Sequence, residues 1–413
     1  MNESNGRIGV GYRFSLRQIQ SFKKIYVLKL VATTFVGLEE TLAAEVSALG
    51  GKHIYLTNRA VIFEGSKKQL YRANLELRTA IRVLQVMEEF QVTDEHQLYD
   101  RIKAVNWPHY FDVTQTFAVT SVVGSHYFNH SQYVALKTKD AIVDRFRDEF
   151  GKRPNVNLLT PHMRINIHIQ GKNCTLSMDS SGDSLHKRGY RIQTVKAPIN
   201  EVLAAGMVLL SGWKGERPLL DPMCGSCTIP IEAAKIARNI PANLGREGFG
   251  FQNWKNYDEN TWKEVVASAK EQIKTSEAPI FAHDKNLRAI KISDENIHEA
   301  GLEDAIQLEK IDFLRSEAPA EDGVIIMNPP YDERLSNVNI GLFYKKIGDH
   351  LKQNYQGYDA WMISSNLPAI KEFGLRSSKK MTLHNGPLEC KYLKYELYRG
   401  SKKSKHQEAQ TDQ

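Results

Sequence analysis

The residue types best suited to chemistry lie in four short segments in the second half of this 413-residue chain. Leu219 to Thr228 places an acid, a proline and a Gly-Ser pair between an expected strand and an expected helix. Backbone N–H groups and a helix N-terminus can approach a ligand closely at such a junction, and Asp221 can receive a cationic group there. Asp284, which is typical of an acid that binds ribose hydroxyls, and Asp312 end two further expected strands. Three acids should therefore meet at one edge of a sheet.

The fourth segment reads Asn-Pro-Pro-Tyr and follows the apolar run Val324 to Met327. The two prolines fix the backbone and carry no N–H, so a carbonyl oxygen points outward without a competing donor. That carbonyl and the Asn328 side chain form two acceptors for one NH2 group, which directs the nitrogen lone pair toward an electrophile. Tyr331 can stack on the planar group that carries the amine. The candidate catalytic residues are Asn328, Pro329, Pro330 and Tyr331.

Cys224 and Cys227 form a C-x-x-C pair that could suggest zinc binding or redox chemistry. A zinc site needs two more ligands, and Cys174 and Cys390 stand alone without a pair of histidines at ligand spacing. We therefore expect no metal. Four cysteines in a chain of this length make no disulfide framework, which favours reduced thiols and a cytoplasmic protein.

Composition places the chain among globular proteins with more than one domain, since 41% of its residues are hydrophobic and 25% are charged. The excess of 55 basic over 48 acidic residues gives a net charge of +7, which favours a polyanionic partner such as nucleic acid. The longest nearly apolar stretch, Val202 to Trp213, is too short to cross a bilayer. The first twenty residues lack the pattern of a signal peptide, so we expect neither a membrane protein nor a secreted one.

The order of expected strands and helices divides the chain near residues 182–195. Before this point we expect a small α+β unit, helical segments over 68–112, a strand at 116–123, a helix at 133–150 and a hairpin after Gly151. After it, repeated βα alternation predicts an α/β domain with a parallel sheet, closed by a hairpin that adds an antiparallel edge strand. The expected divisions are a mobile lead (1–24), the α+β unit (25–66), a second N-terminal unit (67–182), a linker (183–198), the α/β domain (199–400) and a disordered tail (401–413).

The order of the loop at 219–228, the two acids and Asn-Pro-Pro-Tyr resembles class I S-adenosylmethionine-dependent amino-methyltransferases. This resemblance implies a Rossmann-like fold and S-adenosylmethionine as the cofactor. It also implies that the first loop cradles the methionine part, that the acid after the second strand binds ribose, and that the acid after the third strand meets adenine. The cofactor-binding candidates are Asp221, Pro222, Gly225, Ser226, Asp284 and Asp312.

Upstream, Ser131 to Val156 and Asp179 to Arg191 resemble the THUMP RNA-binding module and its linker, preceded by a ferredoxin-like unit. Over about residues 25–400 the chain is most similar to bacterial 23S ribosomal RNA guanine-N2-methyltransferases, which are often labelled N6-adenine-specific DNA methylases. The similarity implies 23S ribosomal RNA or a large-subunit precursor as the partner. Phosphate contacts would come from Lys187, Arg188 and Arg191.

Other functions stay open on the sequence. A tRNA guanine-N2-methyltransferase shares both modules, and a DNA adenine-N6-methyltransferase or a protein glutamine methyltransferase shares Asn-Pro-Pro-Tyr. A non-catalytic RNA-binding assembly factor is the fourth alternative, and its support is Cys227, which stands where the family normally has glycine. A glycine there would suit a backbone with positive φ or a very close approach of the cofactor.

Overall fold

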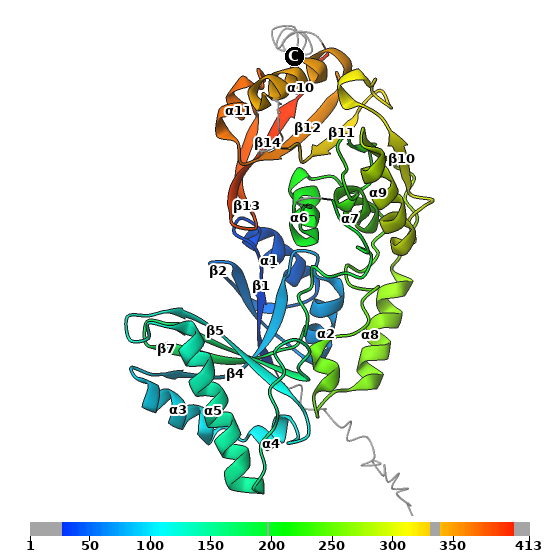
Figure 1. Ribbon diagram of the computed structural model, residues 1–413. Coiled ribbons are helices and arrows are strands. Elements are labelled where there is room, and N and C mark those ends of the chain that lie inside the picture. Colours follow the sequence, from blue (N-terminus) through cyan, green and yellow to red (C-terminus); the bar gives the residue numbers. More distant parts are fainter. Residues whose placement is uncertain (1–26, 196–197, 331–338, 400–413) are drawn as a thin grey trace, which may run out of the picture.

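The computed structural model describes residues 27–195, 198–330 and 339–399, which form an elongated molecule built on two seven-stranded sheets (Figure 1). The expected mobile lead (1–24) and disordered tail (401–413) lie outside the described residues.

The first sheet has the strand order β2-β3-β1-β4-β7-β6-β5. Its neighbouring strands are antiparallel except β5 and β6, which are parallel because the long helix α5 connects them as a crossover. The elements of this half are β1 (Leu28–Thr33), α1 (Glu39–Ala48), β2 (Lys52–Thr57), β3 (Ala60–Gly65), α2 (Lys67–Glu76), β4 (Arg82–Gln91), α3 (Glu95–Ala104), α4 (Trp107–Tyr110), β5 (Phe117–Gly124), α5 (Ser131–Phe150), β6 (Met163–Gln170) and β7 (Asn173–Asp179).

Strand β4 shows that our expectation of helices throughout residues 68–112 was wrong. Residues 82–91 pair with β1 on one side and with β7 on the other, so one continuous sheet joins the two N-terminal units. The polar pair Glu88 and Glu89 hides the strand pattern in the sequence. Pairing with two strands distant in sequence determines this element, because the preference of a segment for a strand depends strongly on its tertiary neighbours.

The second sheet has the order β10-β9-β8-β11-β12-β14-β13, in which β8 to β12 are parallel and the closing hairpin is antiparallel. This arrangement confirms the predicted α/β class with an antiparallel edge. The elements are α6 (Glu201–Ser211), β8 (Leu219–Asp221), α7 (Thr228–Ala237), η1 (Gly250–Asn253), α8 (Glu259–Glu271), β9 (Ile280–Asp284), α9 (Leu287–Ala300), β10 (Ile306–Lys310), η2 (Phe313–Arg315), β11 (Gly323–Met327), α10 (Ile340–Asn354), β12 (Tyr358–Ser364), α11 (Leu367–Glu372), β13 (Lys379–Asn385) and β14 (Leu388–Glu396).

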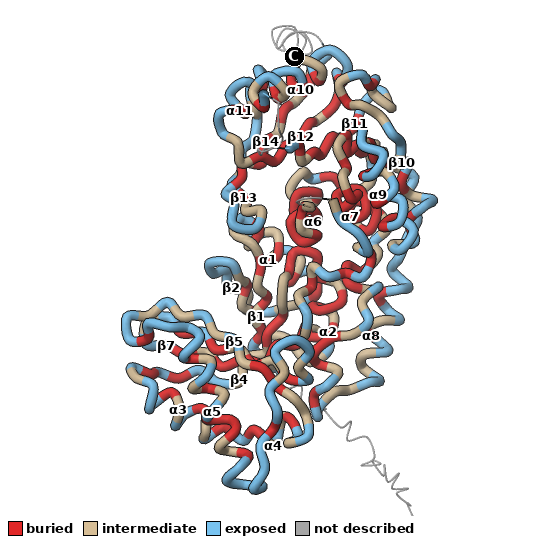
Figure 2. The backbone as a smooth tube through the Cα atoms, in the orientation of Figure 1, coloured by how far each residue is buried: buried red, intermediate tan, exposed pale blue. Residues whose placement is uncertain are grey.

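Strand β11 is buried on both faces, as expected for a central parallel strand covered by helices. Val324 and Ile326 belong to the apolar layer with α6, α7 and α9, whereas Ile325 and Met327 belong to the layer with α10 and α11. Figure 2 shows the resulting band of buried residues through this sheet. The strand is therefore held firmly on both sides just before Asn328.

The nearly apolar stretch 202–213 forms the buried helix α6 and packs inside the protein. Its Gly206 lies against Leu38 of the N-terminal half, where an added Cβ would meet the leucine side chain at 2.6 Å. Of the helices in the described ranges, none is long and apolar enough to cross a membrane.

An insertion between α7 and β9 reaches back from the second domain to the first. It contains α8, a helix that we did not predict, and α8 lies along α2 (Figure 1). The ring of Tyr71 stacks on Phe251 with 4.4 Å between ring centroids, and its hydroxyl oxygen accepts the backbone N–H of Asp258 at 2.9 Å. This interface shares the apolar core of the N-terminal half.

A buried ion pair joins the connector to the second domain. The side chains of Arg188 and Glu232 are both completely inaccessible to solvent, and the Arg188 guanidinium also donates to the Arg78 carbonyl oxygen. Tyr190 donates to the second carboxylate oxygen of Glu232 at 2.8 Å. Arg78 in turn donates to the Ile240 carbonyl at 2.8 Å. Burial of two charges is costly unless each has partners, and here the partners come from both domains and the connector.

Replacement of Glu232 with alanine would leave Arg188 buried without its counter-charge. We expect the free energy of unfolding to fall by about 3–5 kcal/mol, measured by urea denaturation. The control is Lys345→Ala, which breaks the exposed Lys345–Asp349 pair on α10 and should leave the midpoint unchanged. Equal midpoints for the two variants would show that the buried pair does not hold the domains together.

Candidate active site

The topology of the second sheet brings the four sequence segments to one edge. Asp221 ends β8 and Asp284 ends β9, whereas Asp312 and Asn328 follow β10 and β11. These four strands are parallel, so their carboxyl ends share an edge. The chain order reverses between β8 and β11, and the crevice at such a switch point is where open α/β sheets bind ligands. Asp221 and Asn328 stand at the ends of the two strands on either side of that switch point, and the space between these ends is called the crevice.

Asp221 lies in the floor of the first loop and is only 1% exposed. Its carboxylate accepts the Met223 N–H at 3.2 Å. Burial, opposed by the Met223 hydrogen bond and aided by the nearby negative charge of Asp284, raises the pKa of this carboxyl to about 8. A buried acid of this kind ionises more readily when a cation lies beside it.

Asp284 and Gly225 connect the first loop to the end of β9. The Gly225 N–H donates to one carboxylate oxygen of Asp284 at 3.1 Å, and the Asn286 N–H donates to the other at 2.8 Å. The φ of +59° at Gly225 explains the glycine. The Cys224 N–H also donates to the His283 carbonyl at 2.9 Å. These bonds keep Asp284 on the rim beside the loop.

The other predicted cofactor residues lie deeper or further along the rim. Pro222 is buried and Ser226 is 3% exposed, so the loop offers a ligand mainly its backbone at these positions. Asp312 caps η2 by accepting the Leu314 N–H at 3.2 Å.

Cys227 occupies the left-handed region of the backbone, with φ of +63° and ψ of +23°. The loop keeps this conformation although the residue is not glycine, at a cost of about 1–2 kcal/mol. Its side chain is fully buried, and burial raises the pKa of the Cys227 thiol. Neither Cys224 nor Cys227 is in a disulfide, and within the described ranges no group of three or more His, Cys, Asp or Glu residues could hold a metal.

Asn328 directly follows β11 and carries a buried side-chain oxygen for which the described residues supply no hydrogen-bond donor. A buried acceptor left without a partner is costly, and such groups mark places where a ligand supplies the missing donor. Pro329 is buried and Pro330 is exposed, whereas Tyr331 lies outside the described residues. The segment therefore presents an unpaired acceptor at the switch point.

The connector residues predicted to contact RNA have different environments. Lys187 is exposed and pairs with Asp183 at 3.0 Å. The prediction that Arg188 contacts RNA is wrong, because its guanidinium is completely buried in the ion pair with Glu232. The sequence shows a basic cluster but not which members turn inward.

Arg191 lies behind the cofactor loop and is mostly buried. It pairs with Glu201 at 3.1 Å and donates to the Thr228 hydroxyl at 2.8 Å and to the Ile199 carbonyl at 2.7 Å. These bonds tie the linker to the first turns of α6 and α7. Arg191 therefore supports the loop, and its placement favours a positioning role over contact with RNA.

Two residues that we did not predict hold the loop from α9. Ser293 donates to the Gly225 carbonyl at 3.0 Å, and Asn296 donates to the Ser226 carbonyl at 3.0 Å. Both are fully buried. The available signal was a pair of polar residues spaced i, i+3 on the inward face of an amphipathic helix.

Three family models match the chain in succession. They are an RlmL ferredoxin-like domain at residues 29–84, a THUMP domain at 92–179 and an RMKL-like methyltransferase domain at 188–394.

Individual relatives match most of the chain. A Synechocystis protein named "Putative RNA methyltransferase slr0064" is 38% identical over 369 residues, which cover 89% of this chain and 96% of that protein. The "Ribosomal RNA large subunit methyltransferase K/L" of Syntrophotalea carbinolica is 37% identical over 90% of this chain and 54% of its own length. The chain thus spans about half the length of this K/L protein.

Solved structures agree with these matches. The structure of "SMU.472, a putative methyltransferase complexed with SAH" has a TM-score of 0.81 at 30% identity, and covers 91% of this chain and 99% of that one. A "possible methylase from Clostridium difficile 630" has a TM-score of 0.83 at 31% identity, and covers 91% and 100%. The predicted ferredoxin-like and THUMP region followed by a class I methyltransferase fold is confirmed.

Asp221→Asn tests the raised pKa of the buried acid. Because the pKa is about 8 in the fold and 3.8 ordinarily, its stabilising contribution is complete below pH 3.8 and is lost as the pH rises to about 8. Asparagine cannot ionise. The melting temperature of the variant minus that of the wild type should therefore increase from pH 5 to pH 8 and stay constant above pH 8. A difference that stays constant with pH would contradict the raised pKa.

Substitutions at Cys227 test the left-handed backbone. Glycine and alanine both remove the thiol, but only glycine adopts the observed φ without strain. We expect Cys227→Gly to be more stable than Cys227→Ala by about 1 kcal/mol, measured by thermal unfolding. This order is opposite to that in a helix interior, and an alanine variant as stable as the glycine variant would contradict it.

Proposed function

This chain belongs to the family of RMKL-like methyltransferases with an N-terminal THUMP domain, and we propose that it methylates the exocyclic N2 amine of a guanosine in 23S ribosomal RNA. The methyl donor is S-adenosylmethionine.

The residues of the crevice fit this cofactor. The buried Asp221 can accept a cationic group, and the acid rim continues through Asp284 to Asp312. When bound, the cofactor supplies a methyl group on a positively charged sulfur, so no metal is needed as a Lewis acid. The protein's task is then to bind and orient.

The observation that carries the proposal is the buried, unpaired side-chain oxygen of Asn328. An amine N–H would satisfy this acceptor, and the Pro329 carbonyl would accept the second N–H. With both hydrogens held, the nitrogen lone pair points away from the two acceptors and toward the crevice beside Asp221. Tyr331 would stack on the base, which must leave its stack to reach this depth at a cost of a few kcal/mol.

The substrate class rests on the N-terminal half and on the relatives. A THUMP domain implies RNA, and the K/L relatives are named as ribosomal RNA large subunit methyltransferases. We therefore place the reaction on 23S ribosomal RNA or a large-subunit precursor, and the protein in the cytoplasm. Guanine is the base that offers an exocyclic N2 amine.

The backbone at Cys227 speaks against the non-catalytic alternative. Its φ of +63° lies in the left-handed region that glycine adopts freely, so the cysteine is compatible with the loop conformation that a glycine would favour. Asp284 and Gly225 remain hydrogen-bonded across the rim. These features favour a loop that still binds its cofactor.

The test incubates the protein with methyl-labelled S-adenosylmethionine and, separately, unmodified 23S ribosomal RNA, tRNA and duplex DNA. Each sample is then digested to nucleosides. Labelled N2-methylguanosine from 23S RNA alone supports the proposal. Label in tRNA would show that the substrate is tRNA and not 23S ribosomal RNA, and label in DNA adenine would overturn the assignment of RNA as the substrate. A protein that binds the cofactor but labels no substrate, including ribosomal precursor particles, would favour the non-catalytic factor.

Two variants separate chemistry from cofactor binding in this assay. Asn328→Ala should reduce transfer by about 100-fold or more, as expected for loss of an orienting acceptor, and leave cofactor affinity nearly unchanged. Asp284→Ala should weaken cofactor binding first, measured by calorimetry. Equal loss of transfer and binding in Asn328→Ala would contradict its role, and unchanged affinity in Asp284→Ala would remove that acid from the ribose site.

A further inference from the structure

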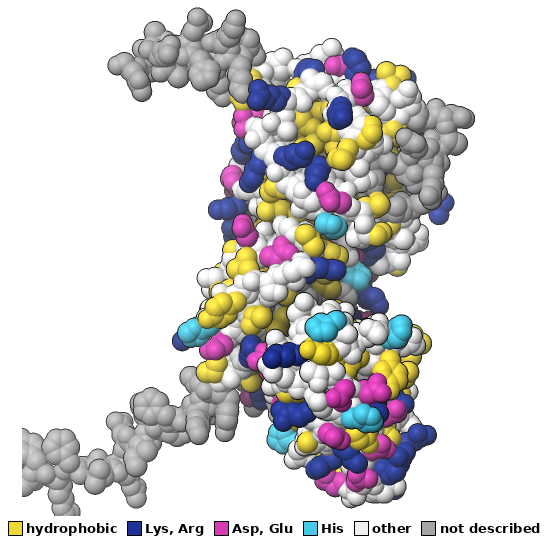
Figure 3. All heavy atoms as spheres, turned by 90° about the vertical axis from the view of Figure 1, so that its left-hand side faces the viewer, with side chains coloured by type: hydrophobic (Ala, Val, Ile, Leu, Met, Phe, Trp, Pro, Cys, Tyr) yellow, Lys and Arg dark blue, Asp and Glu magenta, His cyan; other side chains and the backbone are white. Residues whose placement is uncertain are grey.

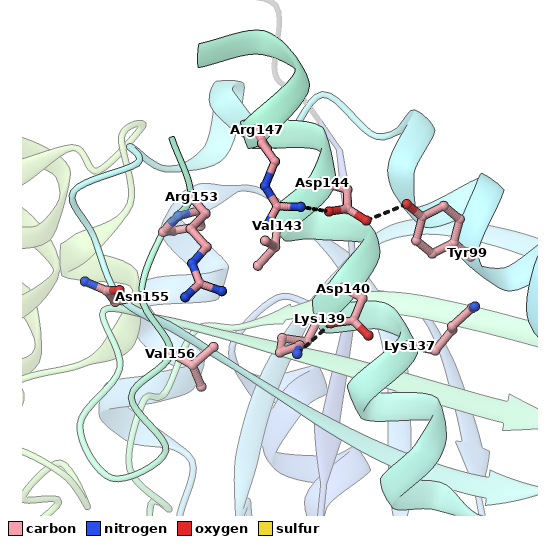
Figure 4. A pocket seen from close by; sticks show the side chains of 11 residues that line it. Tyr99, Lys137, Lys139, Asp140, Val143, Asp144, Arg147, Arg153, Asn155 and Val156 are labelled. Carbon is pink, nitrogen blue, oxygen red and sulfur yellow. Dashed lines mark hydrogen bonds and ion pairs between the residues drawn. The ribbon is translucent and has the colours of Figure 1, made fainter. Parts of the chain in front are cut away.

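A groove with a volume of about 590 Å³ crosses the outer surface of α5, far along the chain from the crevice (Figure 4). Its lining includes four basic side chains, whereas Arg188 and Arg191 of the connector are buried or mostly buried. Helix α5, the segment after it and one side chain of α3 form its walls. The lining residues are Tyr99, Lys137, Lys139, Asp140, Val143, Asp144, Arg147, Arg153, Pro154, Asn155 and Val156.

Two cations of the groove have no carboxylate partner among the described residues. The Lys137 ammonium lies 5.1 Å from the centroid of the Tyr99 ring, which keeps it in place by a cation–π contact and leaves its charge available. Arg153 is exposed and makes no ion pair with any described residue. In Figure 4 its guanidinium lies on the opposite side of the groove from Lys137.

Two carboxylates lie between these cations. Asp144 is fully engaged, because one of its oxygens accepts the Tyr99 hydroxyl at 2.7 Å and the other accepts Arg147 at 2.6 Å. Asp140 differs, since one oxygen pairs with Lys139 at 2.6 Å while the other accepts no hydrogen bond from the described residues. Its side chain is 54% exposed. The groove thus places a carboxylate oxygen that lacks a donor among the described residues between two cations that lack a carboxylate partner there.

The spacing of these residues puts them on one face of the helix. Lys137, Asp140, Asp144 and Arg147 are separated by three or four residues, so they form a stripe about 15 Å long at 1.5 Å per residue. That length accommodates more than one nucleotide of one strand of a duplex stem, since successive phosphates rise by about 3.4 Å along a duplex strand.

We propose that this groove binds the ribose-phosphate backbone of the RNA substrate, with Lys137 and Arg153 on phosphates and Asp140 accepting a ribose 2′-hydroxyl. The proposal rests on the proposed function for its substrate class and assigns to that substrate a second contact surface. It also explains why a polyanion site contains carboxylates. A carboxylate beside a phosphate is repulsive unless it receives a hydrogen-bond donor, and the 2′-hydroxyl is the donor that RNA has and DNA lacks.

Charge density alone does not identify this surface. Figure 3 shows basic and acidic side chains interspersed over the lower lobe, which contains the first sheet and its helices. A partner attracted only by net charge would gain little here. An alternating pattern of cations and an acceptor favours a ligand that itself alternates phosphates with hydroxyl donors.

The test measures binding of the full-length protein, without cofactor, to a fluorescent RNA stem-loop and to the same sequence as DNA over a range of salt concentrations. In Lys137→Ala/Arg153→Ala, affinity for both nucleic acids should fall by roughly tenfold, with a salt slope shallower by about 2, one unit for each lost phosphate contact. In Asp140→Asn, the preference for RNA over DNA should fall while the salt slope stays close to that of the wild type.

The matched control is Lys214→Ala/Lys263→Ala, which removes two exposed lysines elsewhere, one of them paired with Glu259 on α8. It should bind both nucleic acids like the wild type. A groove variant that keeps the wild-type affinity and slope would overturn the phosphate contacts. An Asp140→Asn protein that binds RNA and DNA more tightly by the same factor would show that the carboxylate is merely repulsive, and would overturn the 2′-hydroxyl contact.

The readout separates this inference from the proposed function. Binding is measured without methyl transfer. If the groove variants bind both nucleic acids like the wild type while the protein still labels RNA, only the inference is overturned. RNA binding through the groove with no labelled guanosine from any substrate would instead overturn only the proposed chemistry.

Discussion

The buried ion pair between Arg188 and Glu232 is the constraint on which the arrangement of the two halves depends. Two charges removed from water are destabilising unless partners offset the loss, and this network draws its partners from the connector, the segment after α2 and α7. Arg246 extends the clamp by donating to the carbonyls of Ser184 and Lys187 at 2.9 and 2.6 Å. The connector is therefore part of a core, and the N-terminal half and the crevice of the second domain have a defined separation. With a flexible linker in place of this connector, the distance between the two parts would vary.

The crevice carries several locally unfavourable features that the surrounding fold sustains. A buried acid with a raised pKa ends β8, an unpaired buried acceptor directly follows β11, and a left-handed residue that is not glycine precedes α7. Each costs free energy, and all three belong to elements around the point where the strand order reverses. Hydrogen bonds from Ser293 and Asn296, together with the two apolar layers around β11, hold this arrangement. Costs concentrated at one edge of a well-packed sheet are typical of a binding site.

The α5 groove and the crevice at the strand ends lie on separate parts of the molecule. The crevice presents acceptors suited to one amine, whereas the groove on α5 presents two free cations around the free oxygen of Asp140. The first sheet, which runs through β4 into both N-terminal units, connects the groove to the interface at Arg78. One surface can then hold a backbone while the other receives an extruded base.

The sequence alone determined the features that local pattern controls: the βα alternation of the second half, the order of Asp221, Asp284, Asp312 and Asn328, and the resemblance that these carry. Short motifs are legible because a strand end, a turn and a helix start each depend on neighbouring residues. Only the tertiary structure decided that residues 82–91 form a strand and that Arg188 turns inward. Both outcomes depend on partners distant in the chain. A polar strand needs its neighbouring strands, and a basic residue becomes buried only where a distant carboxylate offsets the cost of leaving water.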